Sequence, residues 1–526
     1  MIEEPSTASR QIARAAGVVM LAFVLSNLTG LARQILVAQA FGTQAEIEAF
    51  NAANRVAETL FNLVAGGALA SAFIPTFTTL LTQGDRKGAW RLASAILNLI
   101  LAIMAIATAL AAIFAPQITR YILAPGFASD PAKEALTISL LRLMLPSAAI
   151  FGVSGLVMGI LNAHQVFFIP AFTPSMYQIG LIFGVLVLSP RMGIYGLAWG
   201  VLLGAGLHLI LQIPALLKQK GHYTPTFDLT NPAVRETGRL LGPRLLGVAV
   251  VQLNFWVNTR LASQQSEGSV TAIVTAFALM LMPQAAIAQS VAIAAMPTFA
   301  AQFARGRLDE VRKSLADSLR GVLLLSIPAS LGLILLRRPI IVLLYQRGAF
   351  DEHSTQLVAW ALLWYAAGLV GHCLVEVLAR AFYALHDTRT PVIVGSVVMV
   401  LNIIFSVLFS AIFTRIGWLP HGGLALANSL ATALEAVGLM YYMRRRLGGL
   451  HGTHILRGSL QAAAGTLLMS LVLWLWVEKI GAAGSWLIAL GGIAVGGGIY
   501  LLALWALGAR ELHALARAVS RRLSAR

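Results

Sequence analysis

The chain has 526 residues, of which 58% are hydrophobic and only 11% are charged, and its mean hydropathy is +0.79. A soluble domain carries about 25% charged residues, so this composition excludes an ordinary soluble protein. The net charge of +17 does not indicate nucleic-acid binding, because the basic residues lie mainly in short loops and at helix ends, where they set membrane topology.

Apolar stretches long enough to cross a hydrocarbon core of about 30 Å recur along the whole chain. In lipid every backbone N–H and C=O must be paired within the segment, so these stretches are predicted to be helices. No large soluble domain fits between them. We expect about fourteen transmembrane helices, at residues 12–40, 45–82, 90–114, 134–163, 171–188, 193–217, 234–262, 269–303, 315–336, 355–386, 391–412, 421–445, 456–478 and 484–508.

An internal repeat organises these spans. Residues 73–77 (Phe-Ile-Pro-Thr-Phe) recur 222 residues later as 295–299 (Ala-Met-Pro-Thr-Phe), and Gly84 and Gly306 follow at the same spacing. Six spans per copy place both copies in one orientation. Such parallel repeats, with a binding site between them, are a transporter architecture. A duplication kept only for stability is the alternative.

The predicted fold is therefore an all-α integral membrane protein with two parallel six-helix lobes and a C-terminal helix pair. The lobes are residues 1–220 (spans 1–6) and 221–447 (spans 7–12). Residues 448–526 hold spans 13 and 14 and a basic cytoplasmic tail, which either lies on anionic headgroups or is solvated.

The distribution of Lys and Arg predicts the orientation. With the N-terminus inside, the inner side carries about three times as many basic residues as the outer loops. We therefore expect a multi-pass protein of the bacterial cytoplasmic (inner) membrane with both termini in the cytoplasm. The basic residues assigned to outer loops are Arg120, Lys133, Arg191, Arg337, Arg338, Arg347, Arg415 and Lys479.

Several charges remain within the predicted spans. A charge at the bilayer centre costs roughly 2.5–3.5 kcal/mol or more, so such residues usually face a polar cavity or each other. Arg142 is expected to snorkel to the outer surface. Arg55 and Glu58 are one helical turn apart, so Arg55 could either form an internal ion pair with Glu58 or contact the substrate, and both alternatives are kept. The intramembrane set is Arg33, Arg55, Arg142, Arg260, Arg380, Glu48, Glu58 and Glu376.

Arginines in a membrane cavity suit a phosphate or pyrophosphate ligand, because guanidinium binds such groups in bidentate fashion and stays charged. The sequence shows no Walker A loop and no catalytic motif, so no enzyme activity and no cofactor are predicted. A single cysteine, Cys373, and scattered histidines give no metal site. The expected partners are a lipid-linked anionic substrate and membrane lipids, without nucleic acid.

Three stretches carry a resemblance to a known family. Residues 26–33 (Ser-Asn-Leu-Thr-Gly-Leu-Ala-Arg), 124–127 (Ala-Pro-Gly-Phe) and 377–391, which ends His-Asp-Thr-Arg-Thr-Pro, resemble the MurJ (MviN) lipid II flippases of the MOP exporter superfamily. The resemblance covers nearly the whole chain. It implies a fourteen-helix transporter for peptidoglycan biosynthesis, and hence for cell wall biogenesis and cell shape, with cavity arginines on the pyrophosphate. From the intramembrane charges and this resemblance together, the predicted substrate-binding residues are Arg33, Arg55, Arg260, Arg380 and Asn27, with Glu48 and Glu58 as gate or charge partners.

The sequence departs from the family pattern at several cavity positions. Asn27, Phe61 and Ala278 stand where the family carries arginine, and Gln34 stands where it carries aspartate. Each charge-assisted contact is worth about 1.5–3 kcal/mol, so these changes bear on the cargo. Arg260 could compensate in part.

Two further predictions concern ion coupling and motion. Asn258, Asn402 and Asn428 lie in apolar spans and are the candidate site for a coupling cation, with sodium and proton both considered; interhelical hydrogen bonding is the alternative use of such amides. The candidate hinges are Gly30, Gly67 and Pro75, for which close helix packing is the alternative.

The functional hypothesis is a flippase that moves lipid II from the inner to the outer leaflet by alternating access. The alternatives are an exporter of another lipid-linked saccharide, a cation-coupled drug antiporter of the same superfamily, and a paralogue that has lost transport and serves as a membrane scaffold.

Overall fold

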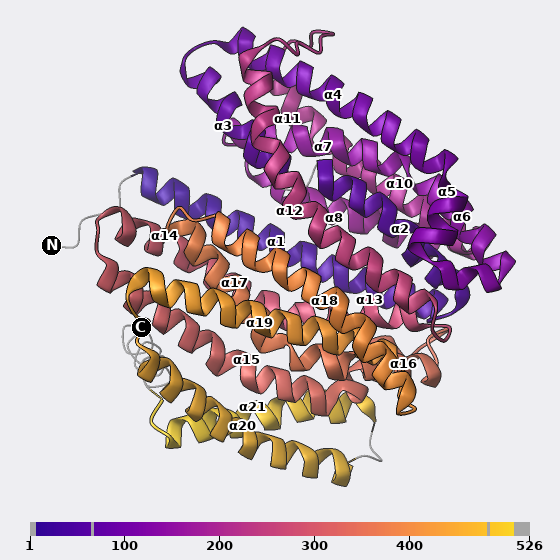
Figure 1. The fold of residues 1–526 in the computed structure, drawn as a ribbon, viewed down its shortest axis with the longest axis vertical. Coiled ribbons are helices and arrows are strands. Elements are labelled where there is room, and N and C mark those ends of the chain that lie inside the picture. Colours follow the sequence, from indigo (N-terminus) through magenta and orange to yellow (C-terminus); the bar gives the residue numbers. More distant parts are fainter. Residues whose placement is uncertain (1–6, 65–67, 481–483, 510–526) are drawn as a thin grey trace. The chain divides into compact units, whose positions relative to one another are not determined.

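A computed structural model describes residues 7–64, 68–480 and 484–509, and all regular secondary structure in these ranges is helical (Figure 1). The chain divides into two compact units, Met1–Glu267 and Gly268–Arg526, and each is described by itself. The predicted all-α membrane fold is confirmed. The basic tail and Gly67 lie outside the described residues.

The first unit holds the helices from α1 to α12, with short π or 3-10 segments between some of them. In chain order they are α1 (Thr7–Phe41), α2 (Ala45–Val64), α3 (Ala68–Thr82), α4 (Arg86–Ile113), α5 (Ala115–Gln117), η1 (Ile118–Leu123), η2 (Pro125–Ser129), α6 (Pro131–Met144), α7 (Pro146–Ala163), α8 (Phe168–Phe183), η3 (Gly184–Leu188), α9 (Ser189–Met192), α10 (Ile194–Ile210), α11 (Ile213–Lys218) and α12 (Pro232–Ser263). Helix α12 packs on α2 and α3. The predicted lobe boundary at residue 220 stays a prediction.

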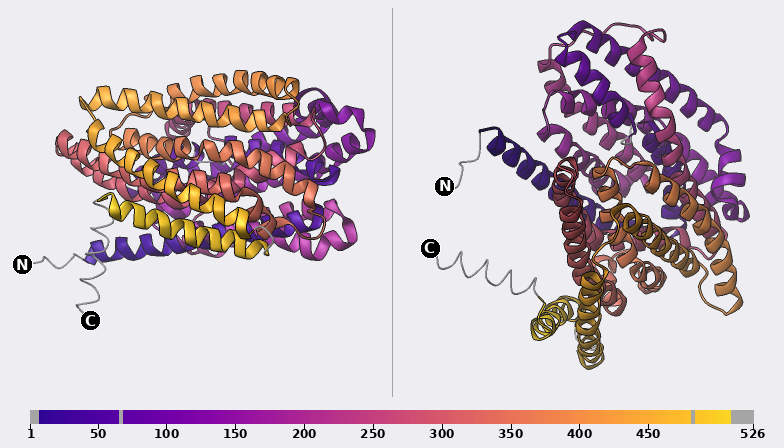
Figure 2. Two further views of the ribbon diagram at one scale, coloured as in Figure 1. Left: turned by 90° about the horizontal axis from the view of Figure 1, so that it is seen from below. Right: turned by 60° about the vertical axis from the view of Figure 1, so that its left-hand side comes forward.

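The second unit continues with α13 (Ser269–Gln284), η4 (Ala285–Gln289), α14 (Ser290–Ala304), α15 (Leu308–Tyr345), α16 (Glu352–Ala367), α17 (Leu369–Ala384), α18 (Arg389–Arg415), α19 (His421–Leu447), α20 (Gly452–Ile480), η5 (Leu487–Gly491) and α21 (Gly492–Ala506). Helices α18 and α19 pack along each other, and α20 packs on α15 and α21 (Figure 2). The phenol of Tyr500 in α21 donates to the carbonyl oxygen of Leu324 in α15 at 2.5 Å, which ties the C-terminal pair to the rest of the unit.

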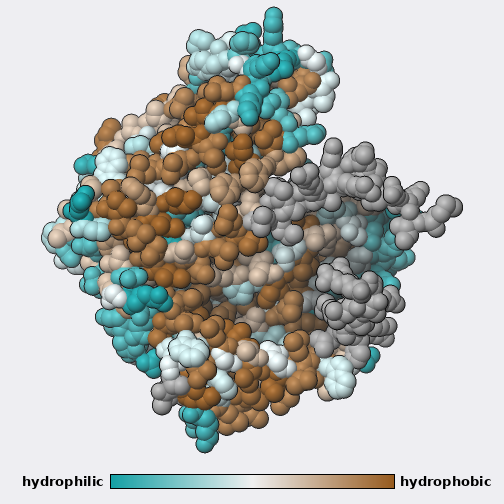
Figure 3. All heavy atoms as spheres, turned by 180° about the vertical axis from the view of Figure 1, so that it is seen from behind, coloured by the Kyte–Doolittle hydropathy of each residue, from teal (hydrophilic) through white to brown (hydrophobic). Residues whose placement is uncertain are grey.

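Among the described residues, ten helices are long and apolar enough to cross a membrane, or twelve if each of two bent pairs is one span. The predicted total of fourteen is therefore not confirmed. The difference lies at the first two predicted spans, 12–40 and 45–82, where α1 and the pair α2 and α3 are found. Hydrophobic side chains cover much of the face seen in Figure 3, and hydrophilic ones gather toward its margins, as a lipid-facing surface requires.

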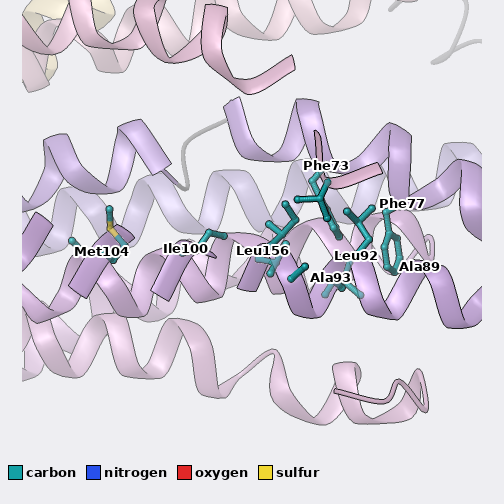
Figure 4. Packing of buried hydrophobic residues seen from close by; sticks show 13 residues of the cluster. Phe73, Phe77, Ala89, Leu92, Ala93, Ile100, Met104 and Leu156 are labelled. Atoms are coloured by element: carbon teal, nitrogen blue, oxygen red, sulfur yellow. The ribbon is translucent and has the colours of Figure 1, made fainter. Parts of the chain in front are cut away.

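The repeated motif has the same local structure in both units. Phe77 in α3 and Phe299 in α14 are both buried. Gly84 and Gly306 follow the two helices and adopt φ values of 78° and 70°, a left-handed conformation that glycine reaches without strain. In the first unit the motif forms a core, since Phe73 and Phe77 lie one turn apart on α3 and pack with Leu92 of α4 and Leu156 of α7 (Figure 4).

Glycines bring α8 and α10 into close contact. A Cβ atom on Gly180 would lie 2.2 Å from the Cα atom of Gly204, and one on Gly184 would lie 2.8 Å from the Cα atom of Gly200. The four-residue spacing places these glycines on one face of each helix, the arrangement that lets membrane helices approach backbone to backbone. The two helices therefore pack without intervening side chains at these points.

Helices α16 and α17 meet at a bend of 48° at Gly368. A bend frees backbone carbonyls that lipid cannot satisfy. Here the hydroxyl of Ser429 donates to the carbonyl of Trp364, and that of Ser330 donates to the carbonyl of Ala366, both at 2.7 Å. A Cβ atom on Gly368 would lie 2.4 Å from the Ser429 hydroxyl, so the corner needs glycine.

Candidate functional site

Arg33 lies on α1, which packs along α8. The side chain is half-buried, and its Nε atom is buried without a hydrogen-bond partner among the described residues. Tyr177 of α8 lies within electrostatic range of both Arg33 and Glu58. Arg33 is therefore an arginine in an apolar helix with donor capacity left unused, which is the property expected of a ligand contact.

The guanidinium of Arg55 in α2 contacts both a carboxylate and an aromatic ring. It donates to the Glu58 carboxylate at 2.9 Å and lies 4.9 Å from the centre of the Phe255 ring of α12. Glu58 also accepts from the amide of Asn54 at 3.0 Å. The Nε atom of Arg55 is buried without a partner among the described residues. Of the two alternatives left open for Arg55, the internal ion pair with Glu58 is present, and the substrate contact stays a prediction.

A polar cluster joins α2 to α12 beside this pair. The indole of Trp256 donates to the hydroxyl oxygen of Thr59 at 2.7 Å, and that hydroxyl lies 3.3 Å from the amide oxygen of Gln252. All three side chains belong to apolar helices, and their mutual hydrogen bonds offset the free-energy cost of burying polar groups there. Arg33, Arg55 and this cluster all lie in the first unit.

Glu48 forms a buried ion pair. The Lys133 ammonium lies 2.5 Å from the Glu48 carboxylate, and the two side chains are 9% and 2% exposed. The same ammonium lies 4.2 Å from the centre of the Phe127 ring, in the Ala-Pro-Gly-Phe segment. Lys133 was expected in an outer loop, but it lies in the first turn of α6. Glu48 therefore pairs with Lys133, and the role predicted for it, gate or charge partner of the substrate site, stays a prediction.

Arg260 is engaged with backbone carbonyls. Its guanidinium donates to the carbonyls of Tyr121 and Ile122 in η1, near the C-terminal end of α12. Gly126 lies against the same end, where a Cβ atom would be 1.9 Å from the Ser263 carbonyl oxygen. The glycine of the Ala-Pro-Gly-Phe motif is thus a packing requirement, and Arg260 secures the adjoining segment.

Arg380 lies in the second unit and is paired within its own helix. Its guanidinium donates to the Glu376 carboxylate at 2.5 Å and 3.0 Å, with about a quarter of each side chain exposed. The substrate role predicted for Arg380 stays a prediction, as does that of Asn27, whose side chain is exposed on α1.

The three asparagines of the predicted cation site are hydrogen-bonded to other side chains. Asn258 donates to Asn254 at 2.9 Å in the first unit, while in the second unit Asn402 accepts from Ser406 at 3.1 Å and Asn428 lies 3.0 Å from His372. These are the contacts expected of the structural alternative. The coupling-ion site stays a prediction.

The predicted hinges differ in their local structure. Helix α1 continues through Gly30, where a Cβ atom would lie 3.7 Å from Gln178 of α8, and α3 continues through Pro75. Phe61, a position at which the sequence is expected to depart from the family pattern, lies with its ring 4.8 Å from that of Phe151.

One intramembrane carboxylate, Glu435, was not among the candidate residues predicted from the sequence. Glu435 lies in the middle of α19, half-buried, and neither an ion pair nor a hydrogen bond to its side chain is found in the part of the chain that the structure describes. The sequence feature that could have identified Glu435 is that it is the only charged residue between His421 and Arg444.

Comparisons with known proteins agree with the fold. A sequence model of the family described as lipid II flippase MurJ matches residues 37–490. The lipid II flippase MurJ of Burkholderia cenocepacia is 30% identical over 435 residues, covering 80% of this chain and 82% of that protein. The probable lipid II flippase MurJ of Vibrio cholerae is 28% identical, covering 96% and 98%.

Solved structures show the same likeness. A lipid II flippase MurJ in an inward closed conformation superposes with a TM-score of 0.81 at 26% identity and covers 94% of this chain and 99% of that one. An inward-facing multidrug transporter of the MATE family, in the MOP superfamily, gives a TM-score of 0.68 at 17% identity, covering 81% and 96%. The second likeness shows the fold alone.

Proposed function

The chain belongs to the MurJ family of lipid II flippases, and on that premise we propose that it moves lipid II from the inner to the outer leaflet of the bacterial cytoplasmic membrane. It is a multi-pass membrane protein. In this proposal Arg33 and Arg55 bind the pyrophosphate group, and the site is exposed alternately to the two sides of the membrane. The chain acts as a transporter and carries no chemical step.

The observation that carries the proposed site is the unused donor capacity of Arg33. A half-buried guanidinium with an unpartnered Nε atom is costly in an apolar helix unless a ligand completes its hydrogen bonds. Arg55 adds a second guanidinium whose Nε atom is likewise unpartnered among the described residues. A pyrophosphate offers several oxygens to two such groups, in the bidentate geometry that guanidinium prefers.

The first experiment is complementation of a bacterium depleted of its essential lipid II flippase. The unaltered chain should restore growth, Arg33→Ala should fail at equal expression, and Arg33→Lys should restore it only in part, because lysine keeps the charge without the planar fork. Arg191→Ala, at an exposed position in the short helix α9, is the matched control and should behave as the unaltered chain. Normal growth with Arg33→Ala would exclude the assigned role.

The second experiment measures binding of lipid II to the purified protein. Loss of one charge-assisted contact of about 1.5–3 kcal/mol should weaken binding roughly tenfold to one hundredfold in Arg33→Ala. A monophosphate lipid of the same tail length should bind more weakly than lipid II to the unaltered protein. Equal affinity for both lipids would argue against pyrophosphate recognition.

We propose in addition that both termini face the cytoplasm, on the basis of the excess of Lys and Arg on the inner side. Reporter fusions test this orientation. A phosphatase that is active only outside the cytoplasmic membrane should be inactive when fused after Arg526, and a fluorescent protein that folds only inside should be bright there. The reverse pattern would invert the proposed topology.

A further inference from the structure

Glu435 lies where a charge is hardest to accommodate. It is in the middle of α19, with Leu434 and Val437, which are 39% and 67% exposed, directed outward close to it on the same helix. Exposed leucine and valine side chains at this level indicate contact with hydrocarbon. A carboxylate here is held at a depth where an ionised group costs roughly 2.5–3.5 kcal/mol or more.

Four other carboxylates, on helices α2, α6 and α17, each pair with a basic side chain. Glu48 pairs with Lys133, Glu58 with Arg55, and Glu376 with Arg380. Glu134 pairs with Arg120 in the first turn of α6. For Glu435 the structure shows neither a basic partner nor a hydrogen-bond donor within the described ranges, so its charge is not compensated by a neighbouring side chain.

The side chain of Glu435 lies against the backbone of α18. A Cβ atom on Gly395 would be 3.2 Å from its Oε1 atom, and one on Gly438 of α19 would be 3.2 Å from Val394. Helices α18 and α19 thus approach closely on both sides of the carboxylate. The absence of a side chain at Gly395 leaves the space in which the carboxylate lies.

The ionisable groups on the packed neighbours are few. Tyr383 of α17 lies within electrostatic range of Glu435 and also of Arg380 and Glu376, which neutralise each other. His372 of α17 is engaged with Asn428 and Thr432 of α19. The remaining charged residues of the helices packed on α19 are at helix ends: Arg389 and Arg415 of α18, and Glu352 and His353 of α16, while α13 has none.

We propose that Glu435 is a proton-binding site of the second unit, protonated when it faces hydrocarbon and deprotonated when it gains access to water. Protonation removes the uncompensated charge without a basic partner, and the phenol of Tyr383 lies within electrostatic range of the carboxyl group. Coupling of this proton to lipid II movement rests on the proposed function, and the proton site itself does not.

The first test uses dicyclohexylcarbodiimide, an apolar reagent that modifies protonated carboxyl groups in lipid. The full-length protein in liposomes is treated between pH 6 and pH 9, and the modified residues are identified by peptide mass spectrometry. Glu435 should be modified at pH 6, at least tenfold less at pH 9, and not at all in Glu435→Gln. Modification of the paired Glu376 should be much weaker at both values.

Three results would overturn the proposal: no modification of Glu435, modification that does not change with pH, or protection by sodium at constant pH, which would make the site a cation site. Glu478→Gln, at an exposed position near the end of α20, is the matched control and should leave the modification of Glu435 unchanged.

The second test measures lipid II transport in proteoliposomes with an imposed pH gradient. The unaltered protein should respond to the gradient and Glu435→Gln should not; an unchanged response would overturn the coupling. If even the unaltered protein fails to move lipid II, the proposed function fails, while the carbodiimide result stands independently.

Discussion

The ammonium of Lys133 in α6 lies 2.5 Å from the carboxylate of Glu48 in α2, and less than a tenth of either side chain is exposed. A buried pair of this kind contributes little relative to two apolar side chains, but leaving one member alone is costly. The Phe127 ring covers the ammonium and completes the enclosure.

Removing one member of this pair should therefore destabilise the protein strongly. We expect Lys133→Met to lower the free energy of unfolding by about 3–5 kcal/mol, because it removes the basic partner of the buried Glu48 carboxylate. The double variant Glu48→Leu with Lys133→Met should recover most of that loss. Unfolding by sodium dodecyl sulfate titration measures both, and additive losses in the double variant would show that the two residues are not coupled.

The contact between α8 and α10 makes a second prediction. Gly180→Ala should lower the free energy of unfolding by about 1–3 kcal/mol, because its Cβ atom would lie 2.2 Å from the Cα atom of Gly204 and must push the helices apart. Gly206→Ala is the matched control, since no atom lies within 4 Å of its added Cβ atom. Thermal melting in detergent should separate the two variants, and equal melting temperatures would contradict the close packing.

Asp387 links α18 to α19 at their cytoplasmic ends, as the proposed topology places them. Its carboxylate accepts from the backbone N–H groups of Arg389 and Thr390 at 3.1 Å and 3.0 Å, and from the guanidinium of Arg446 at 2.6 Å. Burial raises the pKa of Asp387, but the hydrogen bonds from Thr390 and the charge of Arg446 outweigh it and hold the pKa below its ordinary value. The ionised form is therefore the one that the fold stabilises.

The sign of the pH dependence follows from that lowered pKa. The stabilisation by Asp387 is fully present above the ordinary aspartate pKa of about 4 and is lost as the pH falls through the lower pKa of the folded protein. Asp387→Ala should cost about 1–2 kcal/mol at pH 7, as for loss of a helix cap, and less under acidic conditions. Melting temperatures of both proteins across that pH range test this, and a constant difference would count against it.

The pair formed by Arg55 and Glu58 predicts a gain of binding. Glu58→Gln removes the carboxylate that competes with the ligand for the guanidinium, so the affinity for lipid II should rise about fivefold, or about 1 kcal/mol. Arg55→Ala should weaken binding, and the double variant should show no gain from Glu58→Gln. An equal gain with and without Arg55 would mean that Glu58 acts on the ligand directly.

Much of the fold could be predicted from the sequence because its signals are local. Hydropathy depends on composition within one span, and the repeat at 73–77 and 295–299 reappears as two helices followed by left-handed glycines. The number of spans was harder to predict, since the first two predicted spans, 12–40 and 45–82, are not among the helices long and apolar enough to cross a membrane in the described residues.

The candidate site was less predictable because its chemistry depends on partners far apart in the chain. The sequence identified Arg55 and Glu58, one turn apart, as a potential pair. It gave no indication that Lys133 is buried against Glu48, or that the donors of Arg260 are directed to the carbonyl of Tyr121. Both contacts join residues more than eighty positions apart, which only tertiary packing brings together.

The corner between α16 and α17 has a mechanical consequence. Its freed carbonyls at Trp364 and Ala366 are already occupied by the hydroxyls of Ser429 and Ser330, which belong to α19 and α15. Straightening the corner would break two hydrogen bonds at a depth where water cannot replace them. The bend is therefore rigid and does not act as a hinge. During a transport cycle the four helices that meet there, α15, α16, α17 and α19, should move as one rigid body.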